Sequence, residues 1–161
     1  MKTFLHAALL LAVCAAAQAQ VVRPAPNFGL EGVSKSSTLK SFRGQAVVLV
    51  IAQSSRDKLF RRQVYRFKEL YGQFATEKVV FVAAIENGPQ EVPSDIPFVI
   101  AANPAQVAAD YGVTGRFAIV VIGVDGNLDM ITNKVIPATR VKDVIFNNYE
   151  SQHNSRKELG S

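Results

Sequence analysis

The sequence predicts an α/β fold in which a central mixed β-sheet lies between two layers of helices, as a three-layer sandwich. Two continuous runs of apolar, mostly β-branched residues, at 46–52 and 79–85, are typical of strands buried on both faces. The stretch between them repeats apolar residues every three to four positions, as a helix packed on a sheet does. Asp125-Gly126 predicts a hairpin, which adds antiparallel strands to the parallel pair.

A leader segment precedes this domain. Lys2 supplies a positive charge, an apolar core covers 4–16, and Ala17-Gln18-Ala19 has the small residues of a cleavage site, so the mature chain is expected to start at Gln20. The apolar core is shorter than the roughly 20 residues that a membrane-spanning helix needs, and no transmembrane segment is expected. The chain is predicted to divide into a signal peptide at 1–19, a folded domain at 20–150 and a polar, disordered tail at 151–161.

The only cysteine, Cys14, lies inside this leader. An alternative interpretation makes residues 11–14 a lipoprotein signal with Cys14 acylated, although Val13 is bulkier than the residue that usually precedes such a cysteine. Both interpretations leave the exported protein without a free thiol. The expected location is the periplasm or the outside of the cell.

Composition excludes several kinds of site. Without Lys2, 17 basic residues remain against 13 acidic ones, and this modest excess does not favour a nucleic-acid partner. His153 is the one histidine left after cleavage. Ser-His and Cys-His nucleophile sites, Cys-ligated zinc and multi-histidine metal sites are therefore excluded, and we expect no metal and no cofactor.

The first half of the domain is expected to be extended and then to form a strand and a helix. Pro24 and Pro26 predict an extended lead-in over 20–27, and a turn is expected at Arg43-Gly44. After the strand at 46–52, Ser54 or Ser55 is predicted to cap a helix. Its apolar face is formed by Phe60, Val64, Phe67, Leu70 or Tyr71, and Phe74.

The opposite face of this helix is basic. It carries Lys58, Arg61, Arg62, Tyr65 and Arg66. Such a patch suits acidic partners, phospholipid head groups or other polyanions. The alternative is a solvated face on which Glu69 pairs with a neighbouring cation.

The second half of the domain alternates strands and helices. Expected strands lie at 78–85, 97–101, 117–124 and 127–132, with a loop at 87–97 and a tight turn at Asp125-Gly126 in which both residues have positive φ. One helix starts at Asn103-Pro104 and ends at Tyr111-Gly112. Thr139 is predicted to cap a last helix that runs to Tyr149, with Val141, Val144, Ile145 and Asn148 on its inner side.

Four segments in this order resemble those of a known superfamily. They are 25–30, 39–45, 109–113 and 122–126. The predicted strand at 47–50 follows the second of them. Together they are similar to the entry segment, the first central strand and the hairpin of thioredoxin-like proteins of the redoxin type, the peroxiredoxins and thiol:disulfide reductases. The resemblance covers Pro24 to Val144 and implies a thioredoxin-like three-layer sandwich.

The departures from the family pattern fall on its chemistry. The Cys-x-x-Cys of the reductases would lie at 57–60, and the threonine and reactive cysteine of the peroxidases near Asp57 and Phe60. The cis-proline of the family would lie at Phe117, where a trans bond is expected because a cis bond before a non-proline residue costs about 3 kcal/mol. Asp57 itself is expected to stabilise the first turn of a helix.

The resemblance therefore implies an exported, redox-inactive thioredoxin-like domain that binds a protein or ligand where the active site used to be. The expected binding edge is Ser54, Ser55, Arg56, Phe60, Arg116 and Phe117. If Phe60 and Phe117 are exposed, they form a small apolar patch there; the alternative is that both belong to the core. The partner is expected to be another exported or envelope protein.

Three alternatives stay open at this point: an accessory protein that relies on a partner's cysteines, an enzyme with thiol-free chemistry, and a partner that docks on the basic helix. A deep cavity that joins Asp57, Arg56 and Arg116 would favour an enzyme or anion site. A flat apolar edge at Phe60 and Phe117 would favour protein binding.

Overall fold

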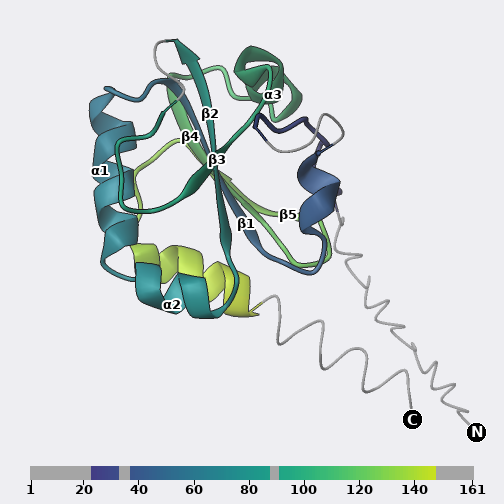
Figure 1. The fold of residues 1–161 in the computed structure, drawn as a ribbon, viewed down its shortest axis with the longest axis vertical. Coiled ribbons are helices and arrows are strands. Elements are labelled where there is room, and N and C mark those ends of the chain that lie inside the picture. Colours follow the sequence, from purple (N-terminus) through teal and green to yellow (C-terminus); the bar gives the residue numbers. More distant parts are fainter. Residues whose placement is uncertain (1–22, 33–36, 88–90, 148–161) are drawn as a thin grey trace, which may run out of the picture.

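The sheet has the expected mixed topology. The computed structural model describes residues 23–32, 37–87 and 91–147 (Figure 1). Its strands are β1 (Val47–Ser54), β2 (Val80–Asn87), β3 (Phe98–Ile100), β4 (Phe117–Ile122) and β5 (Leu128–Thr132). They are arranged in the order β3-β2-β1-β4-β5. The first three run parallel, whereas β4 is antiparallel to β1 and to β5.

Helices cover both faces of this sheet (Figure 1). One face carries α1 (Lys58–Lys68), α2 (Tyr71–Thr76) and a helix over 138–147; the other carries α3 (Pro104–Asp110) and the short 3-10 helix η1 (Leu39–Phe42). Alternate residues of each central strand enter the two cores, as Val48 and Val47 of β1 do. A strand covered on both sides must be apolar at every position, which explains the continuous apolar runs in the sequence.

Several predictions concern residues that the structure does not describe. The leader with Cys14, its cleavage site and the tail from 151 lie outside the described residues. Asn148 and the predicted end of the last helix at Tyr149 also lie outside them.

The predicted helix cap at Ser54 or Ser55 is wrong. Helix α1 begins at Lys58, and its N-cap is Asp57, whose Oδ1 accepts a hydrogen bond from the Leu59 N–H at 2.7 Å. The cap is displaced because β1 continues through Ser54, which pairs with Asn87 of β2 and so keeps an extended backbone.

The helix predicted over the rest of this region is divided in two. Two i→i−3 bonds at the end of α1, from Glu69 and Leu70, tighten its last turn before α2 begins. In a straight helix residues seven apart are separated by about 10 Å. Here the rings of Phe67 and Phe74 are 6.4 Å apart, and both contact Phe81. Rings from both sides of the break thus pack on one residue of β2.

The hairpin between β4 and β5 forms, but with a different turn from the one predicted. Gly126 has a φ of +82°, whereas Asp125 is absent from the described non-glycine residues with positive φ. The Gly126 N–H donates to the Gly123 carbonyl at 2.9 Å, and the Gly123 N–H donates to the Asn127 carbonyl at 2.9 Å. This pattern is typical of a three-residue loop with one left-handed glycine. The Asp125 side chain stabilises it by accepting from the Asn127 N–H at 3.0 Å.

The remaining helix starts are partly as predicted. Asn103 and Pro104 do start α3, and Gly112 follows it with a φ of +68°, but no side-chain hydrogen bond caps this helix. Thr139 is not a cap, because the last helix already includes residue 138. Pro137 directly precedes it, a position where the missing N–H of proline costs nothing.

Tyr111 connects the segment before η1 to the core on the α3 side of the sheet. Its hydroxyl donates a hydrogen bond to the Pro26 carbonyl at 2.9 Å, and its ring packs against Phe28. Burial raises the pKa of the Tyr111 phenol well above its usual value, and the charge of Asp110 adds to the rise.

This raised pKa predicts a loss of stability at alkaline pH. The folded protein keeps the phenol proton to higher pH than the unfolded chain does. The stabilisation is therefore complete below pH 10, near the pKa of an unfolded tyrosine, and is lost as the pH rises from there. Tyr111→Phe is expected to lower stability by about 1 kcal/mol at neutral pH and to reduce the loss above pH 10. Urea unfolding of both proteins at pH 8 and pH 10.5 checks this, and equal pH dependence would contradict it.

Candidate functional site

The candidate site lies at the end of the sheet where β1 leads into α1 and β4 begins. Ala52 of β1 pairs with Phe117 of β4, and the Gln53 N–H donates to the Arg116 carbonyl at 3.0 Å. These two backbone contacts bring Asp57, at the start of α1, close to Arg116. These segments therefore lie at one edge of the sheet, and binding of a partner there stays a prediction.

Asp57 is occupied by structural partners on both oxygens. Oδ1 caps α1, and Oδ2 lies 3.3 Å from the Arg116 Nε. The Asp57 side chain is 12% exposed, whereas that of Arg116 is 58% exposed, so solvent screens the pair. A carboxylate held in this way stabilises the helix start and orients Arg116. Its predicted structural function is confirmed.

Of the two alternatives for Phe60 and Phe117, the structure shows the core position: each is 1% exposed, so they form no apolar patch on the described surface. Both belong to the core on the α1 side of the sheet, and the Phe60 ring lies 6.4 Å from that of Phe98. The first turn of α1 directs Phe60 inward, where it packs instead of presenting a binding surface. The bond between Arg116 and Phe117 is trans, as expected.

The basic face of α1 is exposed as predicted. Its cations are Lys58, Arg61, Arg62 and Arg66. Arg66 lies 3.6 Å from Glu69, which confirms the expected local pairing for one of them. The others have no carboxylate partner among the residues that the structure describes. Three cations on one helix face therefore stay available to an acidic partner.

A groove runs along α1 and has a volume of about 430 Å³. We call it the α1 groove; its lining consists of Ser55, Arg56, Phe60, Arg61, Val64, Tyr65, Lys68, Val92 and Pro93. It includes Arg56 but neither Asp57 nor Arg116, so it is not the deep anion cavity considered from the sequence. It is not a flat apolar edge either. Lys68, Val92 and Pro93 are not among the residues that the sequence predicts for a site, because no local pattern indicates that the loop before β3 packs beside α1.

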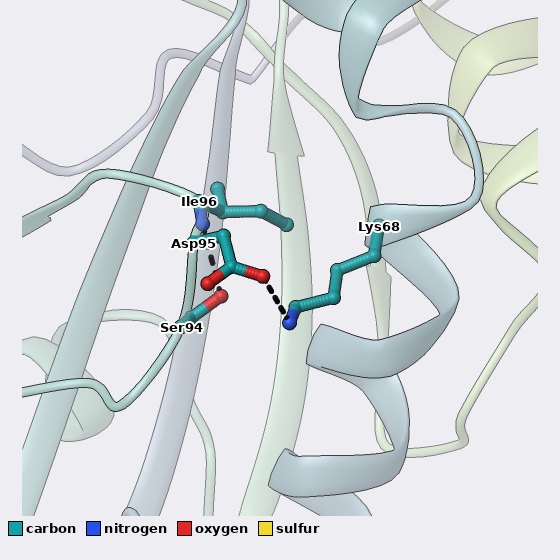
Figure 2. Close-up of polar contacts among 4 residues, drawn as sticks. All are labelled: Lys68, Ser94, Asp95 and Ile96. Carbon is teal, nitrogen blue, oxygen red and sulfur yellow. Dashed lines mark hydrogen bonds and ion pairs between the residues drawn. The ribbon is translucent and has the colours of Figure 1, made fainter.

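An exposed ion pair links this loop to α1 (Figure 2). The Lys68 Nζ lies 2.6 Å from Oδ2 of Asp95, and the Ser94 Oγ accepts a hydrogen bond from the Ile96 N–H at 3.1 Å. Ile96 is 2% exposed and anchors the loop in the core. The burial of Ile96 thus holds this wall of the groove, and the exposed ion pair adds little to it.

No metal site is built among the described residues, where no group of three or more His, Cys, Asp or Glu side chains could hold an ion. His6, Cys14 and His153 all lie in undescribed segments. The expectation that the protein needs no cofactor stays a prediction. None of the helices in the described part of the chain is long and apolar enough to cross a membrane.

Known structures share this architecture. No protein-family model matches the chain, and no curated protein matches it significantly. A Chlorobium tepidum protein assigned as the thiol:disulfide interchange protein DsbE is 21% identical, with a TM-score of 0.58 over 73% of this chain and 88% of that one. A thiol:disulfide interchange protein from a Bacteroides species is 15% identical, with a TM-score of 0.61 over 76% and 86% of the two chains.

A peroxidase has a similar structure. Thioredoxin peroxidase I of Plasmodium yoelii is 16% identical, with a TM-score of 0.59 over 84% of this chain and 92% of that one. At these identities the likeness concerns the fold. The chain has a thioredoxin-like fold, as the resemblance implied.

Proposed function

We propose that this chain is an exported thioredoxin-like domain that performs no thiol chemistry and acts by binding a protein or ligand at the sheet end beside α1. The observation that carries the proposal is that the residues at the two positions where the resemblance would place a thiol make structural contacts. Asp57 caps a helix and pairs with Arg116, and Phe60 is buried in the core. Both residues have become parts of the scaffold.

The inventory of reactive groups supports this proposal. Disulfide exchange and peroxide reduction both begin with a thiolate, and residues 23–147 contain neither cysteine nor histidine. What this region offers instead is exposed cations beside an apolar groove. Such a surface can bind a partner without any bond being made or broken.

The purified chain is expected to show no dithiol-dependent reduction of insulin and no consumption of hydrogen peroxide above the rate in buffer. The reason is that both reactions depend on a thiol, and the mature protein is expected to contain none. Insulin turbidity and peroxide loss measure the two rates, and mass spectrometry of the same sample checks that the chain starts at Gln20.

Two variants make this test specific. Turnover that Cys14→Ser abolishes would show that a retained leader cysteine is reactive. Turnover that Asp57→Asn abolishes would show a catalytic carboxylate, because asparagine caps a helix as well as aspartate does and should leave the fold intact. Either result contradicts the proposal.

A further inference from the structure

The charged residues that line the α1 groove all have the same sign. Arg56, Arg61 and Lys68 contribute to the lining, and no carboxylate does. Lys68 already pairs with Asp95, but the Asp95 side chain is 89% exposed, so this contact is solvent-screened and weak. Arg56 and Arg61 are exposed and have no carboxylate partner among the described residues. The groove is therefore complementary to negative charge.

Between these cations the groove is apolar. Val92 and Pro93 contribute apolar surface from the facing loop, whereas Phe60 and Val64 of α1 are 1% and 6% exposed and contribute little. Tyr65 also lines it and is 67% exposed, one of the two large hydrophobic residues that the described surface leaves open. Exposed aromatic side chains beside arginines are the residues that most often dominate binding energy in protein interfaces. A small hydrated anion would leave this apolar surface uncovered.

The spacing of the groove residues sets the length of a ligand. Arg61, Tyr65 and Lys68 follow one another along α1 at intervals of four and three residues, so they lie on one side of the helix. Seven residues of helix span about 10 Å. An extended peptide covers the same distance with about three residues. A peptide with acidic residues about three positions apart thus reaches both ends of the groove.

We propose that the α1 groove binds an extended peptide segment of a partner protein in which large apolar side chains are flanked by carboxylates. The apolar side chains lie on Tyr65, Val92 and Pro93, and the carboxylates pair with Arg61 at one end and compete with Asp95 for Lys68 at the other. This inference rests on the proposed binding function and adds the class of ligand. An anionic membrane is a different occupant, since it would engage every exposed cation of α1 alike.

The experiment measures fluorescence anisotropy of a labelled peptide, Glu-Glu-Leu-Leu-Glu-Glu, titrated with the full chain. Two matched peptides are Glu-Glu-Ser-Ser-Glu-Glu, which lacks the apolar centre, and Lys-Lys-Leu-Leu-Lys-Lys, which reverses the charge. We expect only the first to bind the unmodified protein measurably. Equal binding of either matched peptide would overturn the proposal.

Arg61→Glu and Arg62→Glu form a matched pair of variants. The two arginines are adjacent and exposed, but Arg62 lines a separate hollow with Arg66 and residues 135–137. Arg61→Glu is expected to weaken binding of the acidic peptide by about tenfold or more, whereas Arg62→Glu should change it by less than about twofold because charges off the contact are screened. Arg61→Glu should also gain affinity for the lysine peptide.

The outcomes separate the possible occupants. If Arg61→Glu and Arg62→Glu weaken peptide binding equally, the net charge of α1 attracts the peptide. That result would contradict the α1 groove as the binding site. Displacement of the peptide by phosphatidylglycerol vesicles to the same extent in both variants would assign the surface to a membrane instead. The redox assays and the titrations test different claims. Redox turnover would contradict the proposed function without affecting peptide binding. Absence of peptide binding would contradict the groove ligand without affecting the outcome of the redox assays.

Discussion

Replacing Gln63 with alanine is expected to lower the free energy of unfolding by about 3 kcal/mol, because it leaves two backbone groups without partners and opens a cavity. Gln63 is fully buried in α1. Its side-chain amide donates to the Ile136 carbonyl at 3.1 Å, and its Oε1 accepts from the Ile136 N–H at 2.9 Å. These bonds join segments 73 residues apart and fix the loop before the last helix.

Urea unfolding measures this effect as a lower midpoint with an unchanged slope. A loss below about 1 kcal/mol, the value of one ordinary hydrogen bond, would show that water replaces the amide without cost. That result would contradict the view that this side chain holds the C-terminal helix in place.

The near-isosteric variant Gln63→Glu tests the pairing separately from the cavity. A protonated carboxyl can donate to the Ile136 carbonyl and accept from the Ile136 N–H, as the amide does, whereas the ionised form cannot donate. Burial raises the pKa of the introduced carboxyl in the folded state. Because the folded state binds the proton more tightly, stability of this variant is expected to fall as the pH rises above about 4, the pKa of an unfolded glutamate. The unmodified protein serves as the control, and a pH dependence equal to its own would contradict the assignment.

Phe81→Ala is expected to have a similarly large effect, a loss of about 3–5 kcal/mol. Phe81 is 2% exposed and lies at the centre of an aromatic cluster, with ring centroids 5.2 Å from Phe67, 5.6 Å from Phe74 and 5.8 Å from Phe98. Removing the ring takes away the surface on which α1, α2 and β3 meet. Since small domains have only about 5–15 kcal/mol of stability, this one change uses much of it.

Tyr65→Ala is the matched control for this prediction. It removes an aromatic ring that is 67% exposed, so its effect on unfolding is expected to stay within about 0.5 kcal/mol. If Phe81→Ala does not fold, Phe81→Leu keeps most of the apolar volume and allows the loss to be measured. Equal losses for Tyr65→Ala and the Phe81 variant would contradict the assignment of Phe81 to the centre of the core.

Local patterns account for the elements that the sequence predicts correctly. The apolar runs that became β1 and β2 have no polar position because both faces of the sheet are covered. Pro104 marks the start of α3, and Gly112 adopts the left-handed conformation after it. Each of these signals acts within a few residues, so it can be read without knowing what packs on it.

The same patterns mislead where a distant contact decides the outcome. The helix cap moved to Asp57 because pairing with β2 holds Ser54 extended. Phe60 follows the apolar stripe of its helix, whereas the comparison of active-site positions left exposure at the sheet edge open as an alternative. Its burial against Phe98 shows that the apolar stripe was the better guide.

By itself the sequence determined that this domain is an α/β sandwich, because the periodicity of apolar residues is a property of the chain alone. Only the tertiary structure decided that Asp57 pairs with Arg116, that Gln63 holds Ile136, and that the loop carrying Val92 forms one wall of the α1 groove. These contacts join residues far apart along the chain. Their formation depends on how the layers pack, which no local pattern specifies.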